Sequence, residues 1–135
     1  MDIRRVAGIV YAVVSAGVVA FQVALALGAP WGAYAMGGAF PGQFPPALRL
    51  AALVQAAVLV LMSGVVLARA GIALRGWFRL SRWLVWVVVA FAAVSLVLNL
   101  ITPSAGERMI WAPVAFVLLV SSLLVATGPM APKQS

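Results

Sequence analysis

Side chains that carry much of protein chemistry are missing or scarce in this chain of 135 residues. It has no cysteine and no histidine, and its only carboxylates are Asp2 and Glu107. The absence of cysteine excludes disulfides and thiol chemistry, and the absence of histidine and of acidic clusters leaves no ligand set for a zinc-type metal site. No histidine, lysine or carboxylate in the long apolar segments could activate a serine or tyrosine as a nucleophile. We therefore expect no catalytic residue, no metal, no cofactor and no enzymatic activity.

Charge is also scarce. Only 8% of the residues are charged, whereas 66% are hydrophobic, compared with roughly 45–50% in soluble domains. A chain of this length cannot bury so much apolar surface in water, so the composition predicts lipid as its solvent. The net charge of +7 comes from basic residues placed between apolar runs. That placement favours orientation in a membrane and excludes a nucleic-acid partner.

Four apolar segments are each long enough to cross a bilayer, namely residues 6–28, 48–68, 83–101 and 109–126. Segments of about 18–23 residues span roughly 27–35 Å as helices, close to the hydrocarbon thickness. The first segment exceeds the roughly 7–15 residues of a signal-peptide core, which favours a spanning helix over a cleaved signal. The predicted fold class is all-α: a polytopic four-helix bundle that forms a single domain over residues 1–135.

The basic residues predict how this bundle is oriented. Seven of them fall on one side of the membrane when the N terminus is cytoplasmic: Arg4, Arg5, Arg69, Arg75, Arg79, Arg82 and Lys133. Only Arg49 and Arg108 fall on the other side. The positive-inside rule therefore predicts that both termini are cytoplasmic. Residues 129–135 have the composition of a disordered tail.

The two longer connections differ in character. Residues 29–47 are rich in glycine, proline and aromatic residues, and we expect them to fold over the outer end of the bundle. Trp31 and Tyr34 either contribute there to a ligand site or only anchor the loop at the headgroup boundary. In the inner basic loop, residues 69–82, a helix would place Arg75, Arg79 and Arg82 on one face. Those three suit contact with anionic lipid, or they only set the orientation.

Small residues recur at every fourth position of the first segment and predict a helix-packing ridge. The ridge comprises Gly8, Ala12, Ala16, Ala20, Ala24 and Gly28. Small side chains let a second backbone approach closely, so this ridge is expected to contact another helix of the chain or a second protomer.

Three amide side chains lie in the predicted outer half of the bilayer: Gln22, Gln55 and Asn99. An amide facing lipid would leave donors and acceptors unsatisfied, so these should point into the bundle. They either hydrogen-bond between helices and set the packing, or they line a polar cavity under the loop. Ser104 and Glu107 match the S-x-x-E capping box, with Glu107 expected to bond back to the Ser104 backbone. Arg108 is expected to pair with Glu107 or with lipid phosphate.

Three groups of residues carry a likeness to a known class of proteins. Pro30-Trp31-Gly32 is followed by a glycine pair, residues 45–49 read PPxLR, and residues 104–113 read SxxERxxWxP. Together they resemble small four-helix integral membrane proteins of high-GC, actinobacterial-like bacteria, a group with no assigned activity. The resemblance implies the four-helix architecture and a bacterial plasma (inner) membrane. It implies no substrate, cofactor or catalytic residue.

The sequence supports three hypotheses about function. The first is a non-enzymatic membrane protein whose outer end binds a lipid, a small apolar ligand or a protein partner. Its candidate residues are Gln22, Trp31, Tyr34, Gln55, Asn99, Glu107 and Arg108. The second is a small oligomeric transporter or channel, although no ionisable residue for proton coupling lies deep in the membrane. The third is an accessory subunit of a larger membrane complex, held by the small-residue ridge.

Overall fold

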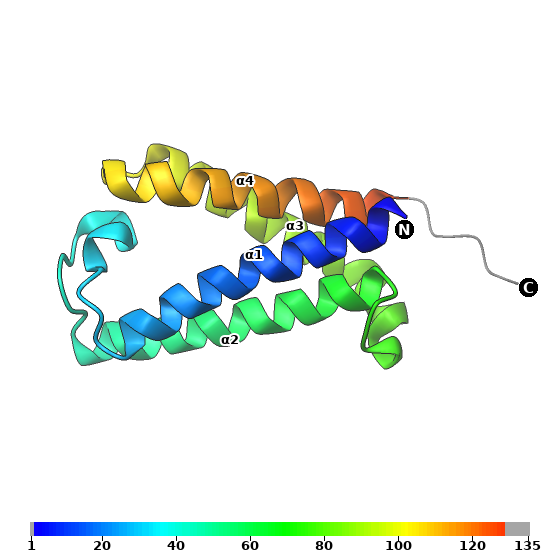
Figure 1. Ribbon diagram of the computed structural model, residues 1–135, viewed down its shortest axis with the longest axis horizontal. Helices are drawn as coiled ribbons and strands as arrows, with labels where there is room; N and C mark the ends of the chain where they lie inside the picture. Colours follow the sequence, from blue (N-terminus) through cyan, green and yellow to red (C-terminus); the bar gives the residue numbers. More distant parts are fainter. Residues whose placement is uncertain (1, 129–135) are drawn as a thin grey trace, which may run out of the picture.

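A computed structural model describes residues 2–128 of the chain (Figure 1). They form four long helices: α1 (Ile3–Ala26), α2 (Pro46–Arg69), α3 (Phe78–Ile101) and α4 (Ala105–Thr127). Three short 3-10 turns accompany them: η1 (Gly32–Tyr34), η2 (Met36–Gly38) and η3 (Arg75–Trp77). All four helices are long and apolar enough to span a membrane. The predicted all-α, multi-pass architecture is confirmed, while Lys133 and the predicted tail lie outside the described residues.

The helices extend beyond the apolar windows at most of their ends, and polar side chains cap the first turns of α1 and α4. Helix α1 begins directly after Asp2, whose carboxylate accepts a hydrogen bond of 3.0 Å from the backbone N–H of Arg5. At its other end, Leu27 is the C-cap and Gly28 has a φ of +104°. The prediction that Gly28 continues the helical ridge is therefore wrong, since the chain has already left the helix there.

The inner basic loop is shorter than predicted. Arg75 belongs to the 3-10 turn η3, whereas Arg79 and Arg82 lie in the first turns of α3. A single helical face for all three arginines is therefore not formed, because the chain becomes α-helical only at Phe78. All three side chains are exposed.

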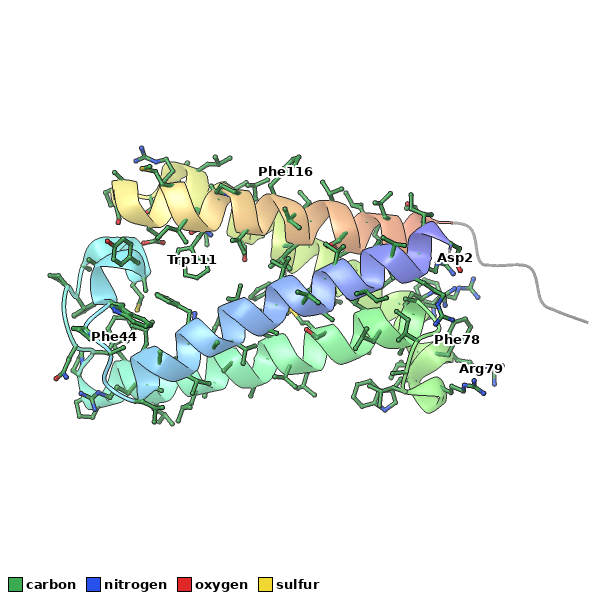
Figure 2. All side chains as sticks on the ribbon, in the orientation of Figure 1. Asp2, Phe44, Phe78, Arg79, Trp111 and Phe116 are labelled. Carbon is green, nitrogen blue, oxygen red and sulfur yellow. The ribbon has the colours of Figure 1, made fainter. Side chains whose placement is uncertain are left out.

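The helices pair as α1 with α2 and α3 with α4, and the pairs meet through α1–α4 and α2–α3 contacts. Figure 1 shows the two pairs close together beside the N terminus and spread apart toward the cyan loop, residues 27–45. We call these two ends the arginine end and the loop end. Figure 2 shows Asp2, Phe78 and Arg79 at the arginine end, and Phe44 and Trp111 at the loop end.

The buried core explains the shape. All four helices share one hydrophobic cluster in the half nearer the arginine end, with Tyr11, Val66, Val88 and Val125 among its fully buried members. At the loop end, a second cluster is built from α1, α2 and the loop alone, namely Leu25, Phe44 and Ala52. Because α3 and α4 contribute nothing to this second cluster, the two helix pairs separate there and leave space between them.

Candidate functional site

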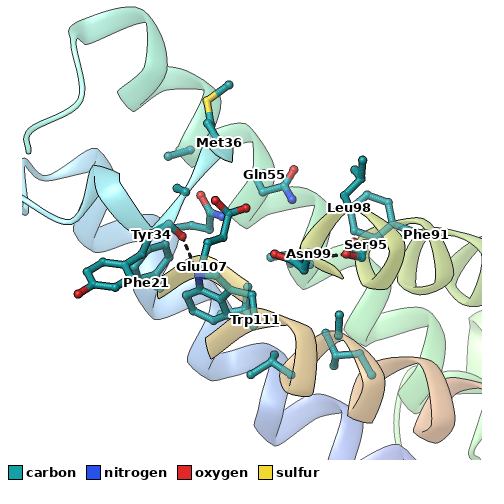
Figure 3. A pocket seen from close by; sticks show the side chains of 18 of the residues that line it. Phe21, Tyr34, Met36, Gln55, Phe91, Ser95, Leu98, Asn99, Glu107 and Trp111 are labelled. Atoms are coloured by element: carbon teal, nitrogen blue, oxygen red, sulfur yellow. Dashed lines mark hydrogen bonds between the residues drawn. The ribbon is translucent and has the colours of Figure 1, made fainter. Parts of the chain in front are cut away.

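That space is a pocket of about 440 Å³ at the loop end, lined by all four helices and the loop. Its inner end is formed by Tyr11, Ala92 and Leu118, which also belong to the shared core. The size falls within the range of about 300–1,000 Å³ that is typical of small-molecule sites. Figure 3 shows the pocket with its polar and aromatic side chains converging from different helices.

The exposed members of the lining mark the mouth of the pocket. They are Tyr34 and Met36 of the loop, Ala51 of α2 and Leu98 of α3. Met36, Ala51 and Leu98 place an opening at the side of the bundle, between α2 and α3 and beneath the loop, whereas Tyr34 lies against α4 at Gly106. For a bundle that crosses a bilayer, a sideways opening leads to the lipid phase, so an apolar molecule could enter without crossing water.

The three predicted amides come together in this pocket. Gln22 from α1, Gln55 from α2 and Asn99 from α3 all line it. Within residues 2–128, the side chains of Gln22 and Gln55 have no hydrogen-bond partner. Asn99 donates from Nδ2 to the backbone oxygen of Ser95 in its own helix, at 2.7 Å. The interhelical bonds expected of packing residues are thus absent from the described part of the chain, and the amides are available to pocket contents.

Glu107 is the one carboxylate in the lining, and it also holds the loop. Its Oε2 accepts a hydrogen bond of 2.8 Å from the backbone N–H of Gly37. The predicted capping box is half formed, because the Ser104 hydroxyl accepts from the Glu107 N–H at 3.1 Å. The return bond is not made: the Ser104 N–H donates to Thr102 Oγ1 at 3.3 Å instead. The Glu107 carboxylate therefore accepts a hydrogen bond from the loop, at the Gly37 N–H, and not from the first turn of its own helix.

Two further hydrogen bonds attach the loop to the start of α4. The Ser104 hydroxyl donates to the Ala33 oxygen at 2.9 Å, and Trp111 Nε1 donates to the Tyr34 oxygen at 2.8 Å. Together with the carboxylate bond they join residues about 70 positions apart in the sequence. The predicted folding of the loop over the end of the bundle is therefore observed, and the loop forms a roof over the pocket.

Glycines make this attachment possible. Gly37 and Gly38 have φ values of +69° and +77°, a region that glycine adopts without steric cost. This turn presents the Gly37 N–H to α4. On the opposing surface, a Cβ atom at Gly106 would lie 2.6 Å from Cε1 of Tyr34, so only glycine lets the ring rest on the helix.

Two predicted site residues do not line the pocket. Trp31 stacks on Phe21 with ring centroids 6.1 Å apart and so supports a lining residue from behind. Arg108 donates to the Thr102 oxygen at 2.8 Å. Among the described residues it makes no ion pair with Glu107, so the predicted pairing of these two is not seen.

Only part of the predicted ridge is covered by the rest of the chain. Gly8 is buried, and a Cβ atom there would lie 2.8 Å from the Cβ of Ala70. Ala12 and Ala24 are half-buried, whereas Ala16 and Ala20 are exposed. The close approach that small residues permit is thus made at the arginine end of α1.

Sequence reasoning selected Tyr34, which lines the pocket, but missed other aromatic residues of the site. Phe21, Phe91 and Trp111 line the pocket, and the rings of Phe21 and Trp111 are 4.6 Å apart at an interplanar angle of 60°. A signal was available for Trp111, because it lies one turn after Glu107 and therefore on the same face of α4. Phe91 carries no comparable signal, since it is one apolar residue within an apolar helix.

No protein-family model, curated protein or solved structure matches the chain. The lining offers amide donors and acceptors, one carboxylate and several aromatic faces on an otherwise apolar surface. This combination suits reversible binding of a molecule with a large apolar part and a small polar part.

Proposed function

We propose that this chain is a non-enzymatic integral membrane protein that binds a small, mainly apolar molecule in the pocket at the loop end. The observation that carries the proposal is the state of the three amides. They reach the same pocket from three helices, and none bonds to another helix within the described residues. Unpaired amides in an apolar site are costly, and a ligand with a polar group, or water, offsets that cost.

The pocket supports binding more than conduction. It ends at Tyr11, Ala92 and Leu118, which belong to the shared core, and beyond them that core fills the space between the four helices. A channel or transporter formed by one chain needs a continuous polar path, and this core provides none. A conducting form would require that path to lie between protomers.

The distribution of arginine supports a direction in the membrane. We place the arginine end and both termini in the cytoplasm and the loop end outside, in a bacterial plasma membrane. The exposure of Arg75, Arg79 and Arg82 suits contact with anionic headgroups of the inner leaflet. In this direction the pocket takes its ligand from the outer leaflet.

A matched pair of substitutions in α2 tests the pocket. Ala51→Phe places a ring in the mouth, whereas Ala57→Phe adds the same ring at an exposed position of the same helix that does not line the pocket. The probe is N-phenyl-1-naphthylamine, a neutral apolar dye, titrated against protein in dodecyl maltoside micelles with correction for empty micelles. We expect saturable binding to the unmodified protein and to Ala57→Phe, and affinity at least tenfold weaker for Ala51→Phe. Equal affinities for both variants would contradict the proposal, as would binding no greater than to empty micelles.

A further inference from the structure

We infer that the pocket selects a lipophilic cation, meaning an apolar or aromatic body that carries an amine or quaternary charge and no phosphate. The inference rests on the proposed function and names the class of ligand for that same pocket.

The charge of the lining is the first step. Among residues 2–128, Glu107 is the one acidic or basic side chain that lines the pocket. Its Oε2 accepts the Gly37 N–H, which leaves the second oxygen, Oε1, to meet a ligand. In the part of the chain that the structure describes, no basic side chain pairs with this carboxylate. The Glu107 carboxylate therefore attracts a cation that enters the pocket and repels an anion.

The two arginines at the loop end do not neutralise the negative charge of the pocket lining. Arg49 donates from Nε to the Phe44 oxygen at 2.8 Å, and Arg108 is held at the Thr102 oxygen. Neither belongs to the lining. Because most of the positive charge of the chain lies at the opposite end, the pocket is a locally acidic site in a basic protein.

The aromatic rings supply the second component of a cation site. Trp111 lies one turn beyond Glu107, and its Nε1 is fixed by the Tyr34 oxygen, so the orientation of its ring is set. Phe21 packs against Trp111 and also lines the pocket. Figure 3 shows Glu107 among Tyr34, Phe21 and Trp111 at one side of the cavity. A cation within about 6 Å of such ring faces is attracted by them, and most strongly by tryptophan.

The same lining argues against a phosphate. A phosphate group needs arginine, lysine or several converging N–H groups, and no basic side chain of residues 2–128 lines the pocket. An aminophospholipid would bring its ammonium to Glu107 only by placing its phosphate beside the same carboxylate. The geometry therefore favours a cation whose remaining atoms are apolar.

Two ions of the same shape and opposite charge test the inference: tetraphenylphosphonium and tetraphenylborate. Each is titrated by equilibrium dialysis against the full chain in uncharged dodecyl maltoside micelles, with empty micelles subtracted. We expect tetraphenylphosphonium to bind at least tenfold more tightly than tetraphenylborate. Glu107→Gln, which keeps an oxygen for the Gly37 N–H, should weaken tetraphenylphosphonium binding at least tenfold. Asp2→Asn is the matched control, because it removes the only other carboxylate, at the far end of α1, and should change binding less than twofold.

Binding of the neutral dye N-phenyl-1-naphthylamine separates the two proposals. If the dye binds to every variant while Glu107→Gln leaves tetraphenylphosphonium binding unchanged, the cation inference is overturned and the pocket itself stands. Equal binding of the two ions to the unmodified chain has the same meaning. Loss of dye binding from Glu107→Gln would show that the carboxylate acts only by holding the loop, which also overturns the inference. Displacement of tetraphenylphosphonium by added phosphatidylethanolamine would overturn the exclusion of phosphate.

Discussion

Gly32 lies where two parts of the long loop cross. Its N–H donates to the Gly42 oxygen at 2.9 Å, and it is buried although it belongs to a loop. A Cβ atom there would overlap the backbone oxygen of Phe40 and lie 2.7 Å from that of Gly42. Both neighbours are backbone atoms, which cannot rotate away as a side chain can. The two parts of the loop can therefore cross at this distance only because residue 32 has no side chain.

Gly32→Ala should loosen the loop without unfolding the bundle. Relief of an overlap with backbone costs about 1–3 kcal/mol, so amide hydrogens of residues 29–45 should exchange about 5- to 150-fold faster, measured by hydrogen–deuterium exchange and mass spectrometry. Gly17→Ala is the control, since no atom lies within 4 Å of a Cβ at that helical position. It should leave loop exchange unchanged. Equal exchange in the unmodified chain and Gly32→Ala would show that the loop has room for the methyl group.

At the scale of elements, hydropathy predicted all four helices but not where they begin. Helix α4 starts at Ala105 because Ser104 caps it, ahead of the apolar window that opens at residue 109. Helix α3 starts at Phe78 and carries Arg79 and Arg82 in its first turns. Long charged side chains can reach the aqueous boundary from inside a helix. An apolar window therefore measures the hydrocarbon layer, and the helix continues past it into the interface.

The contacts between the loop and α4 lay beyond prediction for another reason. The motif around Ser104 and Glu107 identified a helix start, and the local rule gave a partner for each side chain. Glu107 instead bonds Gly37, which is remote in sequence. The capping rule considers only neighbours in the sequence. It assigns the wrong partner to a side chain when the folded chain brings a remote donor or acceptor within reach. The positions of Gln22, Gln55 and Asn99 at the same end of the bundle were predicted correctly. That prediction needed only the direction of each helix and the position of the amide along it.

Ser104→Ala tests how far α4 and the loop depend on one hydroxyl. That oxygen caps α4 and donates to the loop at Ala33, so its loss should destabilise the protein by about 1–2 kcal/mol. The free energy of unfolding is measured by titration with sodium dodecyl sulfate in mixed micelles. Ser63→Ala, a half-buried serine of α2 whose side chain has no hydrogen bond within the described residues, should change it by less than 0.5 kcal/mol, in keeping with the small effect of most unpaired sites. A similar loss in both variants would assign the effect to serine removal in general.

For the whole molecule, the two ends of the bundle differ in how the helices pack. The arginine end is closed by a core that all four helices share, whereas the loop end is split and roofed. One closed end suffices to hold four helices together, and this leaves the other end free to contain a pocket. The same division separates the charges, with basic residues gathered beside the closed end. Which membrane face each end meets therefore decides which leaflet supplies the ligand.

The absence of cysteine allows this orientation to be measured directly, because a single introduced thiol is the only one in the chain. Gln43→Cys places it on the loop and Gly76→Cys on the turn η3, both at exposed positions. In intact cells, a membrane-impermeant maleimide should label Gln43→Cys and should label Gly76→Cys only after permeabilisation, because arginine-rich connections are retained in the cytoplasm. The reverse pattern would turn the pocket toward the inner leaflet, and a lipophilic cation would then be captured from the cytoplasmic side. Labelling of both positions in intact cells would point to two opposite orientations, with pockets serving both leaflets.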